Sequence, residues 1–450
     1  MSNSAVHGDE NRHLRFSESH SPPSARRPIR LITEAVQPCW HSDQLVPHRQ
    51  IHFDPMTDAS QKPLHPEDVH VIDLFAGPGG LDLAAHALGA KSLGIEWDAN
   101  ACETRRAAGL PTEQGDVRAF DPAKFPRANV LAGGPPCQTY TVAGKGAGRR
   151  ALDEVLAFVD RLAKGEAWSH IETDLALLED ERTGLVLQPL HWALDALQNG
   201  NPYQAIVLEQ VPSVLPVWDA FRDVLRESGY SAECGILRTE EFGVPQTRRR
   251  AVLIARYGKQ NKVALPSPTH QPYHKGVQPR PAPAPIDPGL WTEEAGKEDT
   301  PLPWISMGEA LAEFRSGPFT VISNYGTGGN PKARGRRSSR APSATVTGKV
   351  SRNRIVAGEN GLDLPRFTFR EAGMLQTFPE KYPWSGRDVS QQIGNAVPPR
   401  LGLHILSAAL GLDEPPAEAF RRLAQWQPPG RKQRKKPQSS PSPFSTRPRT

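Results

Sequence analysis

Cys137 has the most unusual local sequence among the cysteines, because it follows the run Gly133-Gly134-Pro135-Pro136. The two prolines fix their φ angles, and a nucleophile held at a fixed angle avoids an ordering cost at the moment of reaction. Most cysteines are inert core residues, and that interpretation suits Cys39, Cys102 and Cys234. The local sequence therefore favours Cys137 as a covalent nucleophile.

A glycine-rich turn provides a second chemical feature. The apolar run 71–76 leads into Gly77-Pro78-Gly79-Gly80 and then into a helix near Leu81. Such a turn lets a ligand approach bare backbone at the carboxyl edge of a sheet. A dinucleotide fingerprint needs another glycine at position 82, where this chain has Asp82. The pattern disfavours NAD and favours a nucleoside cofactor without a pyrophosphate.

Two acidic residues follow the glycine turn. Glu96 lies 19 residues after Gly77, where an acid that accepts hydrogen bonds from ribose hydroxyls is expected. Asp116 could supply a carboxylate near an adenine amine, although an ordinary turn aspartate is an equally good interpretation. A phosphate-binding P-loop near Gly144-Lys145 fails, because position 139 is not glycine and position 146 is neither serine nor threonine.

Buried strands must position these loops. From Val69 onward, short apolar runs alternate with helical patterns, which predicts a largely parallel α/β sheet. The expected strands are residues 71–74, 92–96, 129–132, 205–208 and 251–255. Thr368 and Glu371 have the spacing of a capping box that begins a late helix, and residues 399–410 are typical of another.

Composition divides the chain further. Proline supplies 45 of 450 residues, about twice the usual share, which predicts linkers or tails. We expect a disordered N-terminal extension over 1–66 and a main domain over 67–257, which resumes over 366–413. A loop-rich second domain is inserted over 258–365, and a basic Pro/Ser-rich tail covers 414–450.

Net charge says little about partners. The chain carries +5, but the last twenty residues alone hold seven Lys and Arg and no acid. The four cysteines form no CxxC pair or close His/Cys cluster, so we expect no metal and no disulfide scaffold. Neither a secretion signal nor a membrane span is indicated. We therefore expect a cytoplasmic protein, associated with the nucleoid if bacterial.

Several motifs, taken in order, resemble the DNA cytosine-C5 methyltransferase family. They are residues 73–80, 133–138, 209–211, 246–250, 370–371 with 375–379, and 392–399. The resemblance covers roughly 69–410, and the ordered set is highly specific. It implies an α/β, Rossmann-like fold of the S-adenosylmethionine-dependent methyltransferases. The mostly parallel sheet would carry an inserted, loop-rich target-recognition domain.

The resemblance also implies a covalent mechanism. The Cys137 thiolate would attack C6 of a cytosine, which makes C5 nucleophilic. Glu209 would contact and protonate N3, stabilising the charge that develops on the ring. Arg248 and Arg250 would sit around the cytosine carbonyl and a neighbouring phosphate.

S-adenosylmethionine is the implied methyl donor. The turn residues Phe75, Ala76, Gly77, Gly79 and Gly80 would contact its methionine portion. Glu96 would bind the ribose, Trp97 would stack on the adenine, and Asp116 would meet the adenine amine. Asn395 and Val397 would close the same pocket from far along the chain.

The implied partner is double-stranded DNA from which the target base is flipped, so phosphate contacts should dominate affinity. Gln246, Arg248 and Arg250 alternate, and a strand would place all three on one face toward the base. Basic residues crowd the insertion between 331 and 354. The candidate DNA contacts are Gln138, Lys145, Arg149, Arg150, Gln246, Arg334, Arg336 and Arg337.

One residue departs from the family pattern: Gln210 follows the catalytic glutamate where the family usually has asparagine. The extra methylene changes how the amide braces the Pro-Pro-Cys loop, and we expect activity to be retained. Two alternatives stay open, an RNA (transfer RNA) substrate and a catalytically impaired DNA-binding module. We expect a monomer, with a cognate restriction endonuclease as a possible separate partner.

Overall fold

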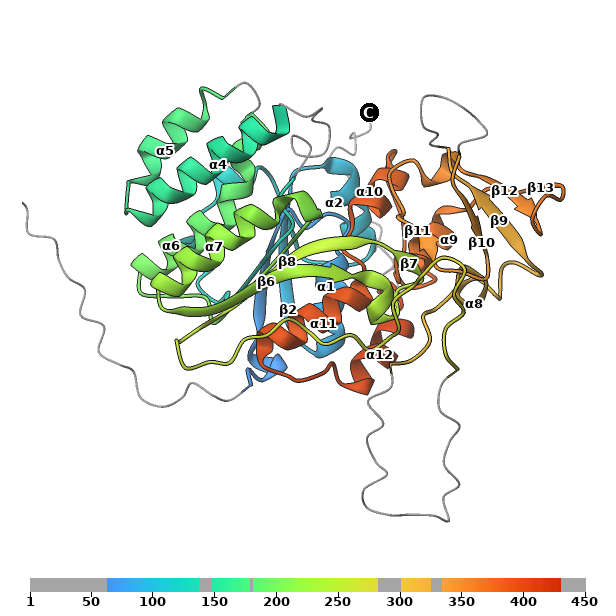
Figure 1. The fold of residues 1–450 in the computed structure, drawn as a ribbon. Coiled ribbons are helices and arrows are strands. Elements are labelled where there is room, and N and C mark those ends of the chain that lie inside the picture. Colours follow the sequence, from blue (N-terminus) through green and yellow to red (C-terminus); the bar gives the residue numbers. More distant parts are fainter. Residues whose placement is uncertain (1–62, 137–146, 179–180, 282–300, 325–333, 430–450) are drawn as a thin grey trace, which may run out of the picture. The chain divides into compact units, whose positions relative to one another are not determined.

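The computed structural model describes residues 63–136, 147–178, 181–281, 301–324 and 334–429. Within these ranges the chain forms an α/β fold, with one large sheet covered by helices on both faces (Figure 1). Residues 1–62 of the predicted N-terminal extension lie outside the described residues, so its disorder stays a prediction.

Seven strands make the large sheet, in the order β3-β2-β1-β4-β5-β8-β6. They are β1 (His70–Leu74), β2 (Lys91–Glu96), β3 (Thr112–Gln114), β4 (Val130–Gly133), β5 (Ala205–Gln210), β6 (Tyr230–Arg238) and β8 (Arg249–Tyr257). Strands β1 to β5 pair in parallel, whereas β8 is antiparallel to both β5 and β6. The mostly parallel sheet and all five predicted strands are confirmed.

Helices cover the sheet because its strands are apolar on both faces. Val71 joins the core cluster of one face and Ile72 that of the other, as expected when successive side chains point to opposite sides. The first face carries α1 (Gly80–Leu88), α11 (Pro399–Leu410) and α12 (Ala417–Ala424). The second carries α4 (Ala147–Ala163), α5 (Trp168–Leu175), α6 (Gln188–Gln198) and α7 (Leu215–Glu227) (Figure 1).

The strand order reverses at β1. From β1 the chain moves to β2 on one side, whereas β4 pairs with β1 on the other side. At such a point the loops that leave the carboxyl ends of neighbouring strands diverge and open a crevice. Here these are the glycine turn after β1 and the Pro-Pro-Cys loop after β4.

The insertion is more regular than the sequence predicted. It contains a four-stranded sheet of order β10-β9-β12-β13, whose central strands are β9 (Phe319–Ile322) and β12 (Arg354–Ala357). The outer strands are β10 (Arg336–Ser338) and β13 (Asp363–Leu364), and α8 (Met307–Ala310) precedes them. Their hydrophobic core continues into α9 (Phe369–Met374) and α10 (Val389–Asn395), beyond the predicted boundary at 365.

The predicted tail also begins later than expected. Residues 417–424, assigned to the tail from the sequence, form α12, where Ala419 and Leu423 pack on α1 and α11. The alternation of apolar and charged residues there has helical period, which the Pro/Ser-rich composition obscured. Among the described residues, no helix is both long and apolar enough to cross a membrane.

Candidate active site

The glycine turn after β1 has the unusual backbone that its sequence predicts. Phe75, Gly77 and Gly79 all have positive φ, at 59°, 54° and 101°. Only glycine takes that conformation without strain, and a bulky residue such as Phe75 takes it rarely. A side chain added at Gly77 would meet no atom within 4 Å, so the space beside this backbone is open. The turn therefore presents bare backbone, flanked by the buried Ala76.

Glu96 binds this turn from the end of the neighbouring strand. Its Oε2 accepts a hydrogen bond from the backbone N–H of Gly77 at 2.7 Å, and its Oε1 accepts one from Asp98 N–H at 2.7 Å. Burial raises the pKa of Glu96 although both hydrogen bonds favour the charged form. Two of the predicted cofactor residues are thus brought into direct contact.

The far end of the chain closes on the same turn. A Cβ on Gly80 would lie 2.0 Å from the carbonyl oxygen of Val397, so only glycine permits this approach. Asn395, at the end of α10, is exposed and accepts a hydrogen bond from Gln391 at 2.7 Å. Val397 therefore packs against the turn, and Asn395 lies two residues before this contact; that the two residues close a cofactor pocket stays a prediction.

Trp97 and Asp116 follow β2 and β3, the next strands of the sheet. Trp97 is 70% exposed, so its ring is available for stacking. Asp116 caps a short 3-10 helix, accepting from Arg118 N–H at 2.9 Å, and also pairs with the Arg118 guanidinium at 2.6 Å. The hydrogen bonds from Arg118 overcome partial burial and lower the pKa of Asp116. Its contacts are those of a turn aspartate, and its role at the adenine amine stays a prediction.

A buried ion pair lies next to the glycine turn, and the sequence did not reveal it. Asp82 binds Arg105 at 2.6 Å, with both side chains fully buried. Although burial opposes the effect, the charge of Arg105 lowers the pKa of Asp82. Burial and the nearby Asp82 charge raise the pKa of Asp73 well above its usual value. A buried acid usually needs a paired cation. The aspartate at position 82, where a dinucleotide fingerprint has glycine, was therefore the sequence signal for this ion pair.

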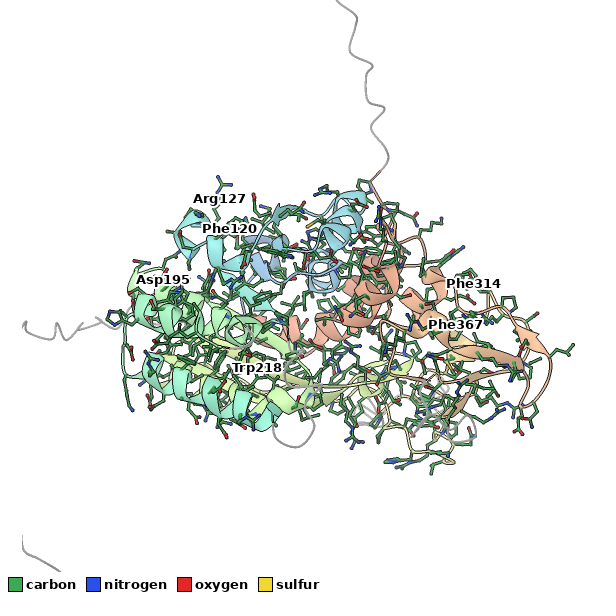
Figure 2. All side chains as sticks on the ribbon, turned by 90° about the horizontal axis from the view of Figure 1, so that it is seen from above. Phe120, Arg127, Asp195, Trp218, Phe314 and Phe367 are labelled. Carbon is green, nitrogen blue, oxygen red and sulfur yellow. The ribbon has the colours of Figure 1, made fainter. Side chains whose placement is uncertain are left out.

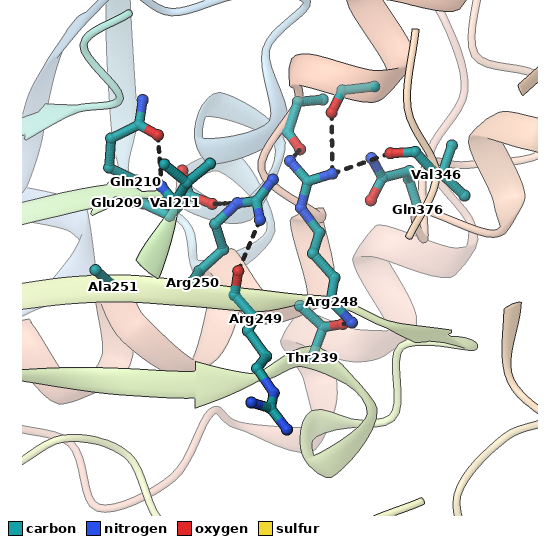
Figure 3. Close-up of polar contacts among 12 residues, drawn as sticks. Glu209, Gln210, Val211, Thr239, Arg248, Arg249, Arg250, Ala251, Val346 and Gln376 are labelled. Atoms are coloured by element: carbon teal, nitrogen blue, oxygen red, sulfur yellow. Dashed lines mark hydrogen bonds and ion pairs between the residues drawn. The ribbon is translucent and has the colours of Figure 1, made fainter. Parts of the chain in front are cut away.

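Glu209 lies beside the start of the Pro-Pro-Cys loop, where β4 and β5 end. Gly134 starts the Pro-Pro-Cys loop, and a Cβ there would lie 3.9 Å from Glu209 Oε2. Glu209 is 4% exposed, and its Oε1 lies 2.7 Å from Arg250 Nε (Figure 3). This contact is an ion pair rather than a well-aligned hydrogen bond. Cys137 lies just outside the described residues, which end at Pro136.

Gln210 makes the bracing contact that the sequence suggested. Its Nε2 donates to the carbonyl oxygen of Pro135, and its Oε1 accepts from Val211 N–H at 2.5 Å. The longer side chain therefore spans from β5 to the Pro-Pro-Cys loop while also binding the backbone N–H of the next residue. The departure from the family pattern keeps an amide in a bracing position.

Gln246 and Arg248 do not face a base, which corrects the prediction that all three alternating residues do. Gln246, in the short strand β7 (Gln246–Thr247), is fully buried and binds Gln376 and Val346 at 2.8 and 2.7 Å. Arg248 is 2% exposed and donates to the carbonyl oxygens of Val346, Gly394 and Ala396 (Figure 3). Burial and the charge of Arg250 lower the pKa of Arg248. Gln246 and Arg248 thus position the insertion and the 394–396 segment.

The other candidate DNA contacts are scattered. Gln138, Lys145 and the side chain of Arg149 lie outside the described residues, while Arg150 is exposed on α4. Arg334 is half-buried. Arg336 donates to the Asn360 side chain at 3.0 Å. Arg337 lies over the ring of Tyr273, with its guanidinium carbon 4.7 Å from the ring centroid. Within the described ranges, no group of three or more His, Cys, Asp or Glu could hold a metal ion.

The chain is similar to a known family and to several known proteins. The family described as C-5 cytosine-specific DNA methylase matches residues 69–158 and 193–410. The type II methyltransferase M1.HphI of Haemophilus parahaemolyticus is 25% identical over 375 residues, which are 76% of this chain and 87% of that protein. The type II methyltransferase M.NgoFVII of Neisseria gonorrhoeae is 26% identical over 365 residues, 73% of this chain and 83% of that protein. The crystal structure of the S. pombe Dnmt2 methyltransferase covers 76% of this chain and 98% of its own, with 17% identity and a TM-score of 0.48.

Proposed function

The chain belongs to the family of C-5 cytosine-specific DNA methylases, and from this premise we propose that Cys137 and Glu209 methylate C5 of a cytosine flipped out of duplex DNA. The family match shows the activity, a DNA cytosine-C5 methyltransferase, and implies that S-adenosylmethionine is the methyl donor. The proposal concerns how this chain's residues carry out that reaction.

The residues around the glycine turn fit the cofactor. The open backbone beside Gly77 forms a cradle that any side chain there would fill, and Glu96 brings acceptor oxygens to the same turn. The exposed Trp97 ring offers a stacking surface for adenine. S-adenosylmethionine would supply the methyl group there. The residues of the turn would orient it, and the Val397 segment would help to exclude water.

The catalytic step combines a nucleophile with a buried carboxyl group. The Cys137 thiolate would add to C6, and Glu209 would hold and protonate N3, so that electron density builds up at C5. After methyl transfer, loss of the C5 proton and expulsion of the thiolate would restore the aromatic ring. Arg250 supports this role because its ion pair orients the Glu209 carboxyl beside Gly134. That Glu209–Arg250 pair, beside the start of the Pro-Pro-Cys loop, is the single observation that carries the proposal.

The proposed cellular role is protective DNA methylation. Two relatives matched over most of their length are type II methyltransferases, which favours protective methylation of a specific duplex sequence. A cognate restriction endonuclease would then recognise the same sequence as a separate protein. Action as a solitary enzyme is the alternative, and the cytoplasm is the expected site of either.

Labelled S-adenosylmethionine tests the substrate directly. Purified protein is incubated with plasmid DNA or with transfer RNA, and bisulfite sequencing then locates each methylated cytosine. We expect label in DNA at one recurring sequence. Label in RNA alone would overturn the DNA assignment, and label in neither would favour the impaired binding module.

A further inference from the structure

A tyrosine from far along the chain binds the glycine turn, and the mechanism above does not use it. Tyr382 lies between α9 and α10, 304 residues after Pro78, and its hydroxyl donates a hydrogen bond to the Pro78 carbonyl oxygen. Pro78 is buried and belongs to neither β1 nor α1, and a buried carbonyl oxygen needs a hydrogen-bond partner. Tyr382 therefore satisfies a part of the turn that no regular element holds.

Three aromatic rings hold the Tyr382 ring in place. The rings of Phe378, Trp384 and Trp426 lie 4.8, 4.9 and 5.3 Å from it, centroid to centroid, in tilted or edge-on arrangements that are favourable for aromatic pairs. Burial among these side chains raises the pKa of Tyr382, so the phenol keeps its proton. The hydroxyl is thus a permanent donor in a fixed position.

Trp426 connects this cluster to the end of the described chain. It lies two residues after α12, in the segment that the sequence assigned to the tail, and its half-buried ring packs against the core of the first face of the sheet. Three residues later, Pro429 occupies the space that a Cβ on Gly109 would need. The chain after α12 is therefore packed next to the residue that binds the glycine turn.

The turn is closed on one side and open on the other. A Cβ on Gly79 would clash with the Leu110 side chain and lie 3.2 Å from the Tyr382 hydroxyl, whereas a Cβ on Gly77 would meet no atom within 4 Å. The space for a ligand is thus beside Gly77, and Tyr382 binds the backbone from the packed side. Tyr382 would act on a ligand through the turn rather than by touching it.

We propose that Tyr382 is a positioning residue for S-adenosylmethionine: its hydroxyl fixes the Pro78 carbonyl, and thereby the open backbone beside Gly77, while Trp426 holds the tyrosine ring. The inference rests on the proposed function, because it takes the space beside Gly77 as the cofactor site. A turn that is already held in its binding conformation avoids an ordering cost when the cofactor binds. Loss of this hold should therefore appear in cofactor affinity.

Tyr382→Phe tests the hydroxyl alone, because the ring and its aromatic contacts remain. Loss of one such hydrogen bond should weaken binding of S-adenosylhomocysteine about fivefold in calorimetry. The KM for S-adenosylmethionine should rise by the same factor with kcat unchanged, because the turn holds the cofactor equally before and during methyl transfer. A hydrogen bond that only stabilises the fold would lower the free energy of unfolding in urea and leave the affinity of the folded protein unchanged.

Tyr203→Phe is the matched control. Tyr203 is also buried, and its hydroxyl has no hydrogen-bond partner among the described residues. It precedes β5, at the end of the parallel strands opposite to the glycine turn. Burial and the nearby charge of Asp195 raise the pKa of Tyr203, and Figure 2 shows Asp195 at the other end of the fold from Phe314 of the insertion. The control should bind S-adenosylhomocysteine as wild type does.

Trp426→Leu tests the hold on the ring, in a double-mutant cycle with Tyr382→Phe. We expect Trp426→Leu to weaken binding of S-adenosylhomocysteine when the hydroxyl is present and to have no further effect once it is gone. An equal effect in both backgrounds would show that Trp426 does not act through Tyr382. If Tyr382→Phe does not fold, an unchanged affinity in Trp426→Leu overturns the proposal.

The proposal is also overturned if Tyr382→Phe binds S-adenosylhomocysteine as tightly as wild type, whatever its stability. Failure of the proposed function looks different. A wild-type protein that binds S-adenosylhomocysteine but methylates no DNA would contradict the proposed function alone, whereas one that does not bind it would overturn the proposed cofactor site and this inference together.

Discussion

Replacement of Gln210 tests how the Pro-Pro-Cys loop is held. The Gln210 amide joins β5 to the carbonyl oxygen of Pro135, two residues before Cys137. Gln210→Ala removes this bond and the bond to Val211 N–H. One such bond contributes about 1 kcal/mol, so its loss from the attack geometry should slow methyl transfer about fivefold.

Two further substitutions distinguish the effect of the Gln210 hydrogen bonds from the effect of side-chain size. Gln210→Glu keeps the shape but presents a carboxylate oxygen to the Pro135 carbonyl, so it should slow the reaction more than Gln210→Ala does. Gln210→Asn keeps the amide on a shorter stem, which cannot span both partners, so its rate should fall between that of wild type and that of Gln210→Ala. Gln204→Ala is the control, because Gln204 is exposed and directly precedes β5, at the opposite end of that strand from Gln210.

Single-turnover methyl transfer at saturating DNA and cofactor isolates the chemical step. Urea unfolding, measured in parallel, reports any loss of global stability. If Gln210→Ala transfers methyl groups at the wild-type rate, the bracing role is wrong. If Gln210→Asn is many-fold faster than wild type, the native glutamine is a handicap rather than an adapted brace.

Three further predictions concern the cofactor side. Gly80→Ala should disrupt the turn because its Cβ would lie 2.0 Å from the carbonyl oxygen of Val397, whereas Gly77→Ala should leave the fold intact but place a methyl group in the space proposed for the cofactor. Calorimetry with S-adenosylhomocysteine should show weaker binding in both variants, and urea unfolding should show that Gly77→Ala loses only the ~1–2 kcal/mol of left-handed strain. Asp82→Asn should destabilise the fold by about 3–5 kcal/mol in urea because it leaves Arg105 buried and unpaired, and a double variant with Arg105→Met should recover part of that loss. Cofactor affinity should fall as the pH drops through the raised pKa of Glu96, and Glu96→Gln should remove that dependence. Because the folded protein binds this proton more tightly than the unfolded chain does, the contribution of Glu96 to folding stability decreases as the pH rises through the same range.

The sequence predicted most of the large sheet because five of its strands contain short apolar runs. Residues 399–410 form the predicted helix with the predicted bounds, and Thr368 with Glu371 makes both bonds of a capping box. Strand β3 was missed because three polar residues carry no periodic signal. The sheet of the insertion was missed for a related reason, since its strands have only two to four residues.

The orientation of Gln246 and Arg248 shows another limit. Gln246 and Arg248 both bind Val346, but their alternation did not indicate that the protein itself covers these side chains. Val346 and residues 394–396 cover them, and both lie about a hundred residues or more away in the chain. A buried arginine bound to three carbonyl oxygens also satisfies the rule that buried charges need partners. Only the tertiary contacts distinguish that role from contact with a base.

A duplex containing 5-fluorocytosine at the target position tests the central claim most directly. Fluorine cannot leave as the C5 proton does, so the covalent intermediate should persist. With S-adenosylmethionine present, we predict a stable protein–DNA adduct whose peptide map places the bond on Cys137, and none with Cys137→Ser. Methylation of ordinary DNA by Cys137→Ser, or an adduct on another residue, would contradict the account.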